Sequence, residues 1–345
     1  MDSLKSAMLG GCFTAILTAT GAAHASPYLT FDIPGAGTGW AQGTSPAAIG
    51  GDSILAGTYV DTNNVQHAFF GAAETGLVTF DAPGAGTDPY EGTTANGVNA
   101  DGVVAGSVDD NGRTHGFVRD ASGNFQVFDA DNNEHTYAWA INNKGVVTGY
   151  TDSEAYVRAA DGTITTFSVP GAQATYAMAI NGKGVVAGYY LDNSFNEHGF
   201  IRSPKGKTLV IFDTPGFAST EVRSIDSKGD VVGIASNRGQ FQPFLRTPDG
   251  TQTIFSPAGC TRAWAESINF DGVITGYCLD SHNVYHSWVR QPGGTITMYD
   301  VPGAGTGGTQ GTLAAAIAPN GKSVGFFVDS NGIYHGYRRN ADPQP

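Results

Sequence analysis

The chain has 345 residues, 49 of them glycine, and carries a formal net charge of −13 at pH 7. This charge excludes nucleic acid and anionic membrane surfaces as expected partners, because both require basic patches. The many glycines and the scarcity of long apolar runs argue against a helical protein and indicate short strands joined by tight turns.

The first segment predicts a signal peptide over residues 1–25. Lys5 precedes an apolar stretch that ends in the small-residue pattern Ala-His-Ala at 23–25, which is typical of a cleavage site before Ser26. A membrane anchor is the alternative, but the stretch is short and weak for a bilayer span. Lipoprotein processing at Cys12 is a minor alternative, because too few residues precede it. We therefore expect a secreted or periplasmic protein with no membrane span after cleavage.

One unit recurs along the rest of the chain. Each unit contains a strand that ends in an aromatic residue, usually followed by Asp and then Pro-Gly. These aromatics are Phe31, Phe80, Phe128, Phe167, Phe212, Phe255 and Tyr299. Their spacing of 39 to 49 residues is the length of one four-stranded propeller blade.

The unit that ends at Phe212 shows the pattern of strands within a unit. Short strands at 175–181, 185–191, 198–202 and 208–212 alternate with Gly, Asn and Asp turns, which predicts an antiparallel meander. The first strand is rich in small residues, so we assign it as the innermost strand. The second strand has a glycine at the same place in every unit, which we attribute to close packing between neighbouring sheets. These glycines are Gly57, Gly106, Gly149, Gly188, Gly233, Gly276 and Gly325.

The two ends of the repeat complete each other. The last unit runs through a third strand at 334–338 and then ends in a polar tail over 340–345, so its fourth strand is missing. Residues 28–32 match the fourth-strand pattern but have no unit before them. We therefore predict an all-β, seven-bladed propeller over residues 26–339, closed by its N-terminal strand, which leaves no open edge. An open solenoid is the alternative, and it leaves the spare strand unexplained.

A family resemblance is visible in the third strands. Several of them begin with His and continue with a small residue and an aromatic residue. Examples are His67-Ala68-Phe69 and His198-Gly199-Phe200, and the second strands follow an Ile-Asn-x-x-Gly-x-Val-Val-x-Gly pattern. Over residues 27–339 the chain resembles the HAF-repeat extracellular proteins of bacteria. The resemblance implies an extracellular repeat protein, and it implies no activity because the family is defined by its repeat.

Five of these histidines follow an aspartate by six positions. The pairs are Asp61 and His67, Asp109 and His115, Asp192 and His198, Asp280 and His286, and Asp329 and His335. Six residues apart across a hairpin is expected to place the two side chains directly opposite each other. One interpretation makes them metal or catalytic sites. We favour hairpin-stabilising pairs, because a catalytic centre is normally used once.

Two units depart from this pattern and two turns resemble a metal site. Glu154 and Gln242 stand where the third and fifth units lack their histidine. The turns that begin at Asp109 and Asp329 resemble the start of a calcium loop, but no glutamate follows at the required distance. We predict no metal ligands and no cofactor, with calcium as an open alternative.

Three loops that link an outer strand to the next inner strand are long and alike. They span 37–44, 86–93 and 305–312 and should lie at consecutive junctions of a closed ring. Trp40 and Tyr90 offer stacking surfaces there, and Gln42, Glu91 and Gln310 offer hydrogen-bonding groups, which together suit a neutral sugar or a small amphipathic ligand. The alternative is that the two aromatics only cover the ring closure.

Cys260 and Cys278 lie in one unit, and an exported protein usually pairs two such cysteines. We expect a disulfide, with two buried thiols as the alternative.

The leading functional hypothesis is a non-catalytic binding or surface-interaction module whose partner is a carbohydrate or another envelope or extracellular protein. The second is an extracellular hydrolase or lyase that uses Asp and His groups and a divalent metal. The third is a purely structural envelope protein. The sequence does not separate them, because fold does not determine function.

Overall fold

The computed structural model describes residues 26–341, apart from residues 52 and 132–134. These residues form 28 β-strands and contain no helix, and hence no helix that could cross a membrane. The expected signal peptide over 1–25 and residues 342–345 of the expected tail lie outside the described residues.

The strands follow the predicted repeat as successive meanders. The chain begins with β1 (Tyr28–Phe31), and its first two meanders are β2 (Gly43–Gly50), β3 (Ile54–Val60), β4 (Gln66–Ala72), β5 (Gly76–Phe80), and β6 (Gly92–Val98), β7 (Val104–Asp110), β8 (Arg113–Arg119), β9 (Phe125–Phe128). The next three are β10 (Tyr137–Ile141), β11 (Val147–Tyr150), β12 (Ala155–Arg158), β13 (Ile164–Phe167), then β14 (Ala174–Ile180), β15 (Val186–Leu191), β16 (Glu197–Arg202), β17 (Leu209–Phe212), then β18 (Ser219–Ile225), β19 (Val231–Asn237), β20 (Gln240–Arg246), β21 (Gln252–Ile254). The last are β22 (Arg262–Ile268), β23 (Ile274–Leu279), β24 (Tyr285–Arg290), β25 (Ile296–Tyr299), and β26 (Gly311–Ile317), β27 (Ser323–Val328), β28 (Tyr334–Arg339).

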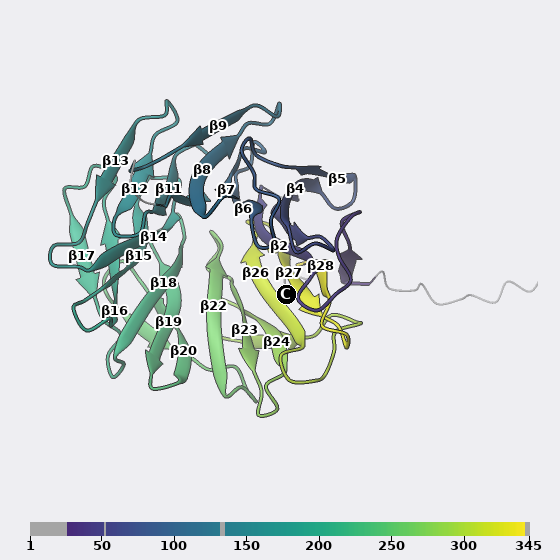
Figure 1. Cartoon of the computed structure of the whole chain (residues 1–345). Helices are drawn as coiled ribbons and strands as arrows, with labels where there is room; N and C mark the ends of the chain where they lie inside the picture. Colours follow the sequence, from purple (N-terminus) through teal and green to yellow (C-terminus); the bar gives the residue numbers. More distant parts are fainter. Residues whose placement is uncertain (1–25, 52, 132–134, 342–345) are drawn as a thin grey trace, which may run out of the picture.

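The meanders are arranged around a common axis (Figure 1). Those formed by β10–β13, β14–β17 and β18–β21 are separate four-stranded antiparallel sheets. The remaining described strands join into a 16-stranded sheet, because β4, β24 and β28 each pair with the first strand of the next meander through one parallel residue pair. Each of these three parallel pairs lies at the end of one of the three long loops. The long loops therefore lie at consecutive junctions between meanders.

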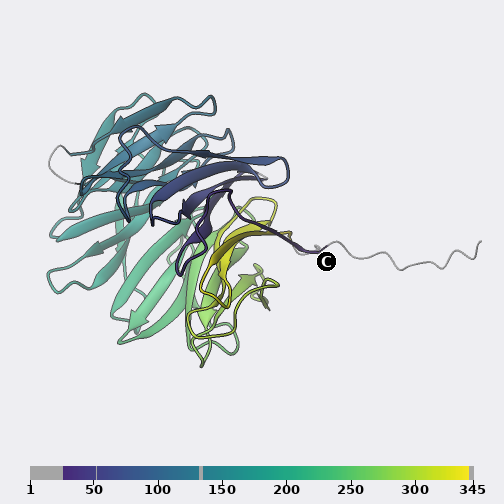
Figure 2. The same cartoon turned by 45° about the vertical axis from the view of Figure 1, so that its right-hand side comes forward.

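The N-terminal strand β1 completes the last meander. It pairs antiparallel with β28, with Tyr28 opposite Arg339 and Phe31 opposite Gly336. The purple N-terminal segment and the yellow C-terminal strands therefore lie side by side (Figures 1 and 2). This is the pairing that the missing fourth strand predicted, and it leaves no spare strand.

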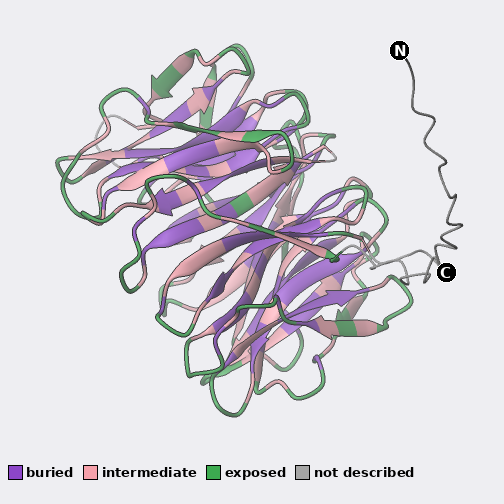
Figure 3. Cartoon of the chain, turned by 90° about the vertical axis from the view of Figure 1, so that its right-hand side faces the viewer, coloured by how far each residue is buried: buried purple, intermediate pink, exposed green. Residues whose placement is uncertain are grey.

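The hydrophobic core lies between neighbouring meanders (Figure 3). The aromatic residue that ends each outer strand packs against the third-strand aromatic of the next meander, as Phe80 does with Phe117 at 6.0 Å between ring centroids and 87° between ring planes. The other pairs are Phe31 with Phe69, Phe128 with Tyr156, Phe167 with Phe200, Phe212 with Phe244, Phe255 with Trp288 and Tyr299 with Tyr337. The recurring aromatics of the sequence are thus the contacts that hold adjacent meanders together.

The second-strand glycines have a different reason from the one predicted. A Cβ on Gly188 would lie 1.9 Å from the carbonyl oxygen of Tyr176, on the first strand of the same meander. The close neighbour is therefore the adjoining strand and not the neighbouring sheet, so that part of the prediction is wrong. Beside this glycine the first strand contains a β-bulge between Ala177 and Ala179, which leaves Met178 outside the ladder.

The same bulge occurs in the first strand of every meander. The bulged residues are Ala47, Asn96, Trp139, Met178, Arg223, Glu266 and Ala315. All of them line one channel along the axis. The first strands are thus innermost, as their small residues indicated.

Candidate functional site

The five histidines are bonded mainly to aspartates that the sequence analysis did not pair with them. Each Nδ1 lies 2.6 to 2.9 Å from a carboxylate oxygen of the aspartate that follows an outer strand. The pairs are His67 with Asp81, His115 with Asp129, His198 with Asp213, His286 with Asp300 and His335 with Asp32. These aspartates stand directly after the recurring aromatics, so the repeat itself contained this signal.

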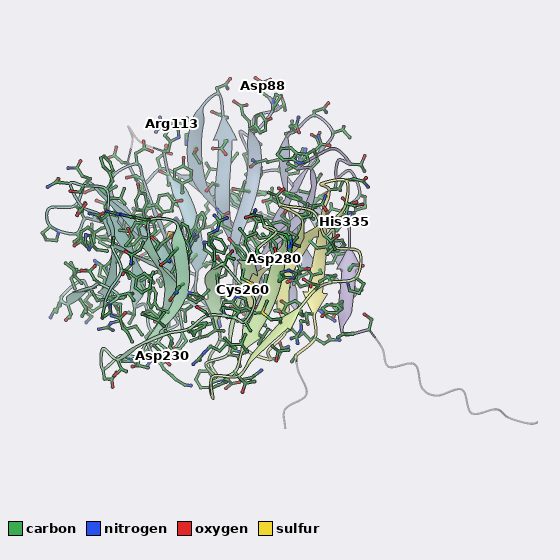
Figure 4. The ribbon with its side chains drawn as sticks, turned by 90° about the horizontal axis from the view of Figure 1, so that it is seen from below. Asp88, Arg113, Asp230, Cys260, Asp280 and His335 are labelled. Carbon is green, nitrogen blue, oxygen red and sulfur yellow. A yellow bond between two sulfur atoms is a disulfide. The ribbon has the colours of Figure 1, made fainter. Side chains whose placement is uncertain are left out.

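Four of the predicted aspartates lie farther from their histidines than the outer-strand aspartates do. Asp61, Asp192, Asp280 and Asp329 lie 3.4 to 3.8 Å from the Nε2 atoms of their histidines. The strand register places Tyr59, and not Asp61, opposite His67, so the prediction of directly opposed pairs is wrong. Asp280, labelled in Figure 4, accepts a hydrogen bond from the backbone of Val284 in its own turn. The main role of these aspartates is therefore to stabilise the turns of their own hairpins.

The fifth predicted pair, Asp109 with His115, does not form. Asp109 lies opposite Thr114 in the ladder and accepts a hydrogen bond from its hydroxyl, so its side chain points away from the face of His115. The turn that follows is a two-residue hairpin loop in which Asn111 and Gly112 have φ of 42° and 78°. Asn-Gly is the preferred pair for such a turn, which explains the acidic turn without a metal.

Where the histidine is missing, its aspartate is missing too. In the β10–β13 meander Glu154 replaces the histidine, and Ser168 stands at the aspartate position and donates a hydrogen bond of 3.1 Å to Glu154 Oε1. Gln242 and Ser256 are the corresponding residues of the β18–β21 meander. The histidine and the aspartate are thus replaced together, which favours a structural role for the pairs over a catalytic one. Over the described part of the chain, no three His, Cys, Asp or Glu side chains are placed to hold a metal ion.

The two glutamines of the predicted loop patch are used within their loops. Gln42 accepts a hydrogen bond from the Gly39 N–H at 2.8 Å and donates to Asn64 Oδ1 at 2.9 Å. Gln310 likewise accepts from a loop N–H and donates at 3.0 Å to a carbonyl of the β27–β28 hairpin. Glu91 occupies the equivalent position in the third loop. The two glutamines thus tie their loops to the meanders that follow them.

The two predicted aromatics are both exposed but lie in different surroundings. Trp40 is 79% exposed and Tyr90 is 75% exposed. Trp40 and Gln310 line a hollow of about 350 Å³, whereas Tyr90 and Glu91 are not among its lining residues. The hollow is also lined by the aromatic rings of Tyr285, Phe326 and Tyr334 and by Thr309, Ser330 and Asn331. None of the described residues that line it is charged.

The larger cavity is the axial channel, of about 690 Å³. Its lining is mostly small or apolar, and Arg223 and Glu266 are the charged side chains among the described residues that line it. Arg223 Nη2 lies 3.0 Å from Glu221 Oε1 on the same strand. Sequence reasoning missed this cluster. Aligning the repeats would have shown two charges at a position where the other units have Ala, Asn, Trp or Met.

Burial dominates the electrostatics of the channel. It raises the pKa of Glu266 above its ordinary value, and the charge of Arg223 offsets this only in part. It raises the pKa of Glu221 in the same way. Desolvation lowers the pKa of Arg223, but the negative charges of Glu266 and Glu221 outweigh it and raise the pKa overall. Glu266, which lines the channel, and Glu221 thus both interact with the one guanidinium of Arg223.

Cys260 and Cys278 form a disulfide with Cα atoms 5.8 Å apart (Figure 4 labels Cys260). It connects the loop before β22 to β23.

Comparison with known proteins identifies the architecture. No family model matches the chain, and no curated protein is similar to it. Inactive virginiamycin B lyase from Staphylococcus aureus with quinupristin matches with a TM-score of 0.57 and 12% identity, over 90% of this chain and 99% of that chain. The fold is a β-propeller.

Two further propellers are similar over most of their length. YCF48 bound to D1 peptide gives a TM-score of 0.55 at 10% identity, over 92% of this chain and 97% of that chain. The β-propeller domain of the Trilobed protease from Pyrococcus furiosus gives 0.53 at 8% identity, over 87% and 96%. Because the neighbours include a lyase and a peptide-bound protein at low identity, they carry the fold and no specific function.

Proposed function

We propose that this chain is an exported, seven-bladed propeller that acts as a non-catalytic binding module for neutral glycans, bound in the hollow beside Trp40. Seven blades are supported by the strand pairings, since β1 with β26–β28 and six further groups of four consecutive strands each form one meander. Export is supported by the signal-peptide pattern over residues 1–25 and by the resemblance to HAF-repeat extracellular proteins.

The composition of the hollow supports the ligand class. An indole that is 79% exposed stands beside three other aromatic rings and several uncharged polar groups. Aromatic faces stack on the apolar faces of sugar rings, while hydroxyl and amide groups bond to sugar hydroxyls. The absence of charge among the described lining residues favours a neutral ligand. The volume of about 350 Å³ is at the lower end for ligand pockets, which fits a small ligand.

The histidines support binding over catalysis. Each of the five is already hydrogen-bonded to an outer-strand aspartate, and the same pair recurs in different blades. A repeated, internally bonded pair is suited to stabilising the blade that contains it.

A glycan array tests the proposal with two matched variants. Trp40→Ala should lose the wild-type glycan signals, whereas Tyr90→Ala, which removes an equally exposed ring outside the hollow, should keep them. The proposal is overturned if Trp40→Ala retains the wild-type pattern, or if the folded wild-type protein binds no neutral glycan.

A further inference from the structure

The charged side chains of the axial channel are a second site, separate from the hollow beside Trp40. Arg223 and Glu266 are bulged residues of β18 and β22, which belong to adjoining meanders. At the equivalent bulges the chain has Ala47 and Ala315 elsewhere in the ring. Since alanine satisfies the same backbone geometry, the fold does not require a charge at this position.

Glu266 shares the guanidinium of Arg223 with Glu221. Its side chain is partly buried and lines the channel, and among the described residues it makes no hydrogen bond and no direct ion pair. Arg223, the nearest cation, is paired with Glu221 at 3.0 Å. The two carboxylates therefore exceed the one guanidinium by one negative charge. An uncompensated charge in a partly buried position is costly, so this position favours a positively charged ligand.

Part of the channel lining is aromatic. Trp139, Tyr277 and Phe326 line the channel, and Trp264 stacks on Tyr277 with 5.1 Å between ring centroids. Aromatic faces attract organic cations through their quadrupoles, and they do so more strongly in a desolvated site. A metal ion needs several oxygen ligands, whereas an ammonium group needs one carboxylate and an apolar surface for its carbon body.

We propose that the axial channel binds an organic ammonium ion, a primary amine on an aromatic or aliphatic body, with the ammonium group at Glu266 and the body against the channel wall. The volume of about 690 Å³ is within the range of small-molecule pockets. The channel adjoins the glycan hollow, since Leu313, Phe326 and Tyr334 line both cavities, but Glu266 lines only the channel and Trp40 lines only the hollow.

Calorimetric titration of the intact chain with 2-phenylethylammonium tests the site, with 2-phenylethanol as its uncharged analogue. We expect one site for the amine and at least about tenfold weaker binding of the alcohol, the factor expected of a desolvated cation–π and ion-pair contact. Glu266→Gln should remove this preference. Glu91→Gln is the matched control, because it makes the same change at a position where the other two long loops have Gln42 and Gln310.

Further measurements keep the outcome decisive. Ala315→Leu narrows the channel without altering its charges and should weaken amine binding. The amine should also raise the melting temperature of the wild type but not of Glu266→Gln. Equal binding of amine and alcohol, or undiminished amine binding by folded Glu266→Gln, overturns the proposal. Trp40→Ala should leave amine binding intact, so failure here is distinguishable from failure of glycan binding.

Discussion

Deletion of residues 26–32 should open the ring. These residues include β1, which pairs with β28 through four residue pairs. The deletion also removes the edge-on contact of Phe31 with Phe69, at 6.3 Å between ring centroids, and the hydrogen bond between Asp32 and His335. It exposes the backbone groups of β28 as a free edge, which promotes association between molecules.

The expected cost follows from these contacts. Truncating a fully buried Phe costs about 3–5 kcal/mol, and the partly buried Phe31 should contribute about 2–3 kcal/mol. Each ladder hydrogen bond adds roughly 1 kcal/mol, and the exposed Asp32–His335 pair adds at most about 1 kcal/mol. With only one or two such bonds the strand already stabilises the ring by about 5 kcal/mol, which is comparable with the whole stability of a marginal domain. A fall in melting temperature of roughly 10 °C is expected.

Calorimetric melting of chains starting at residues 26 and 33 measures this effect. Thr30→Ala, an exposed change within β1, is the control and should melt like the wild type. A synthetic peptide of residues 26–33 should restore part of the lost melting temperature by pairing with the free edge of β28. If the shortened chain melts like the longer one and does not bind the peptide, β1 does not close the ring and the account of its closure is refuted.

Three further predictions concern stability. Burial raises the pKa of Glu266, so its ionised form destabilises the fold. Glu266→Gln should therefore raise the free energy of unfolding at pH 7. Denaturant unfolding should show that this difference from the wild type vanishes towards pH 4. Burial lowers the pKa of His198, but its hydrogen bond to Asp213 contributes to a net rise. The stability that protonated His198 contributes is full below about pH 6.5 and is lost as the pH rises through the folded-state pKa. The difference in free energy of unfolding between wild type and His198→Gln should shrink over that interval. Reducing the Cys260–Cys278 disulfide, which spans 18 residues, should cost about 3 kcal/mol in thermal melts, whereas a double Cys→Ser variant should not respond to reductant.

The sequence predicted the features that repeat with the meander. Phe80 and Phe167 recur because each occupies the same place at the end of an outer strand, and each packs on the aromatic of the next meander. Counting strands at the two ends was enough to pair residues 28–32 with the last repeat. Such inferences succeed because one local rule is tested many times along the chain.

Features that depend on strand register were harder to predict. His67 was paired with Asp61, six residues away in the sequence, but its close partner is Asp81, fourteen residues away across the next strand. Both aspartates are near the same end of the meander, and only the ladder decides which one lies beside the ring. The bulge that turns residue 266 into the channel is likewise a property of backbone pairing that no composition pattern reveals.

Differences between equivalent positions are therefore more informative about function than the repeat itself. The bulged residues share one backbone environment, so Ala315 and Glu266 face nearly the same geometric requirement. Alanine meets it without desolvating a charge, whereas Glu266 places a carboxylate in the channel at a cost in folding free energy. A side chain that lowers stability at a position where a neutral one fits is explained by function and not by folding. The same reasoning applies to Trp40, since Gly308 stands at its position in an equivalent loop and an exposed indole adds nothing that the turn requires.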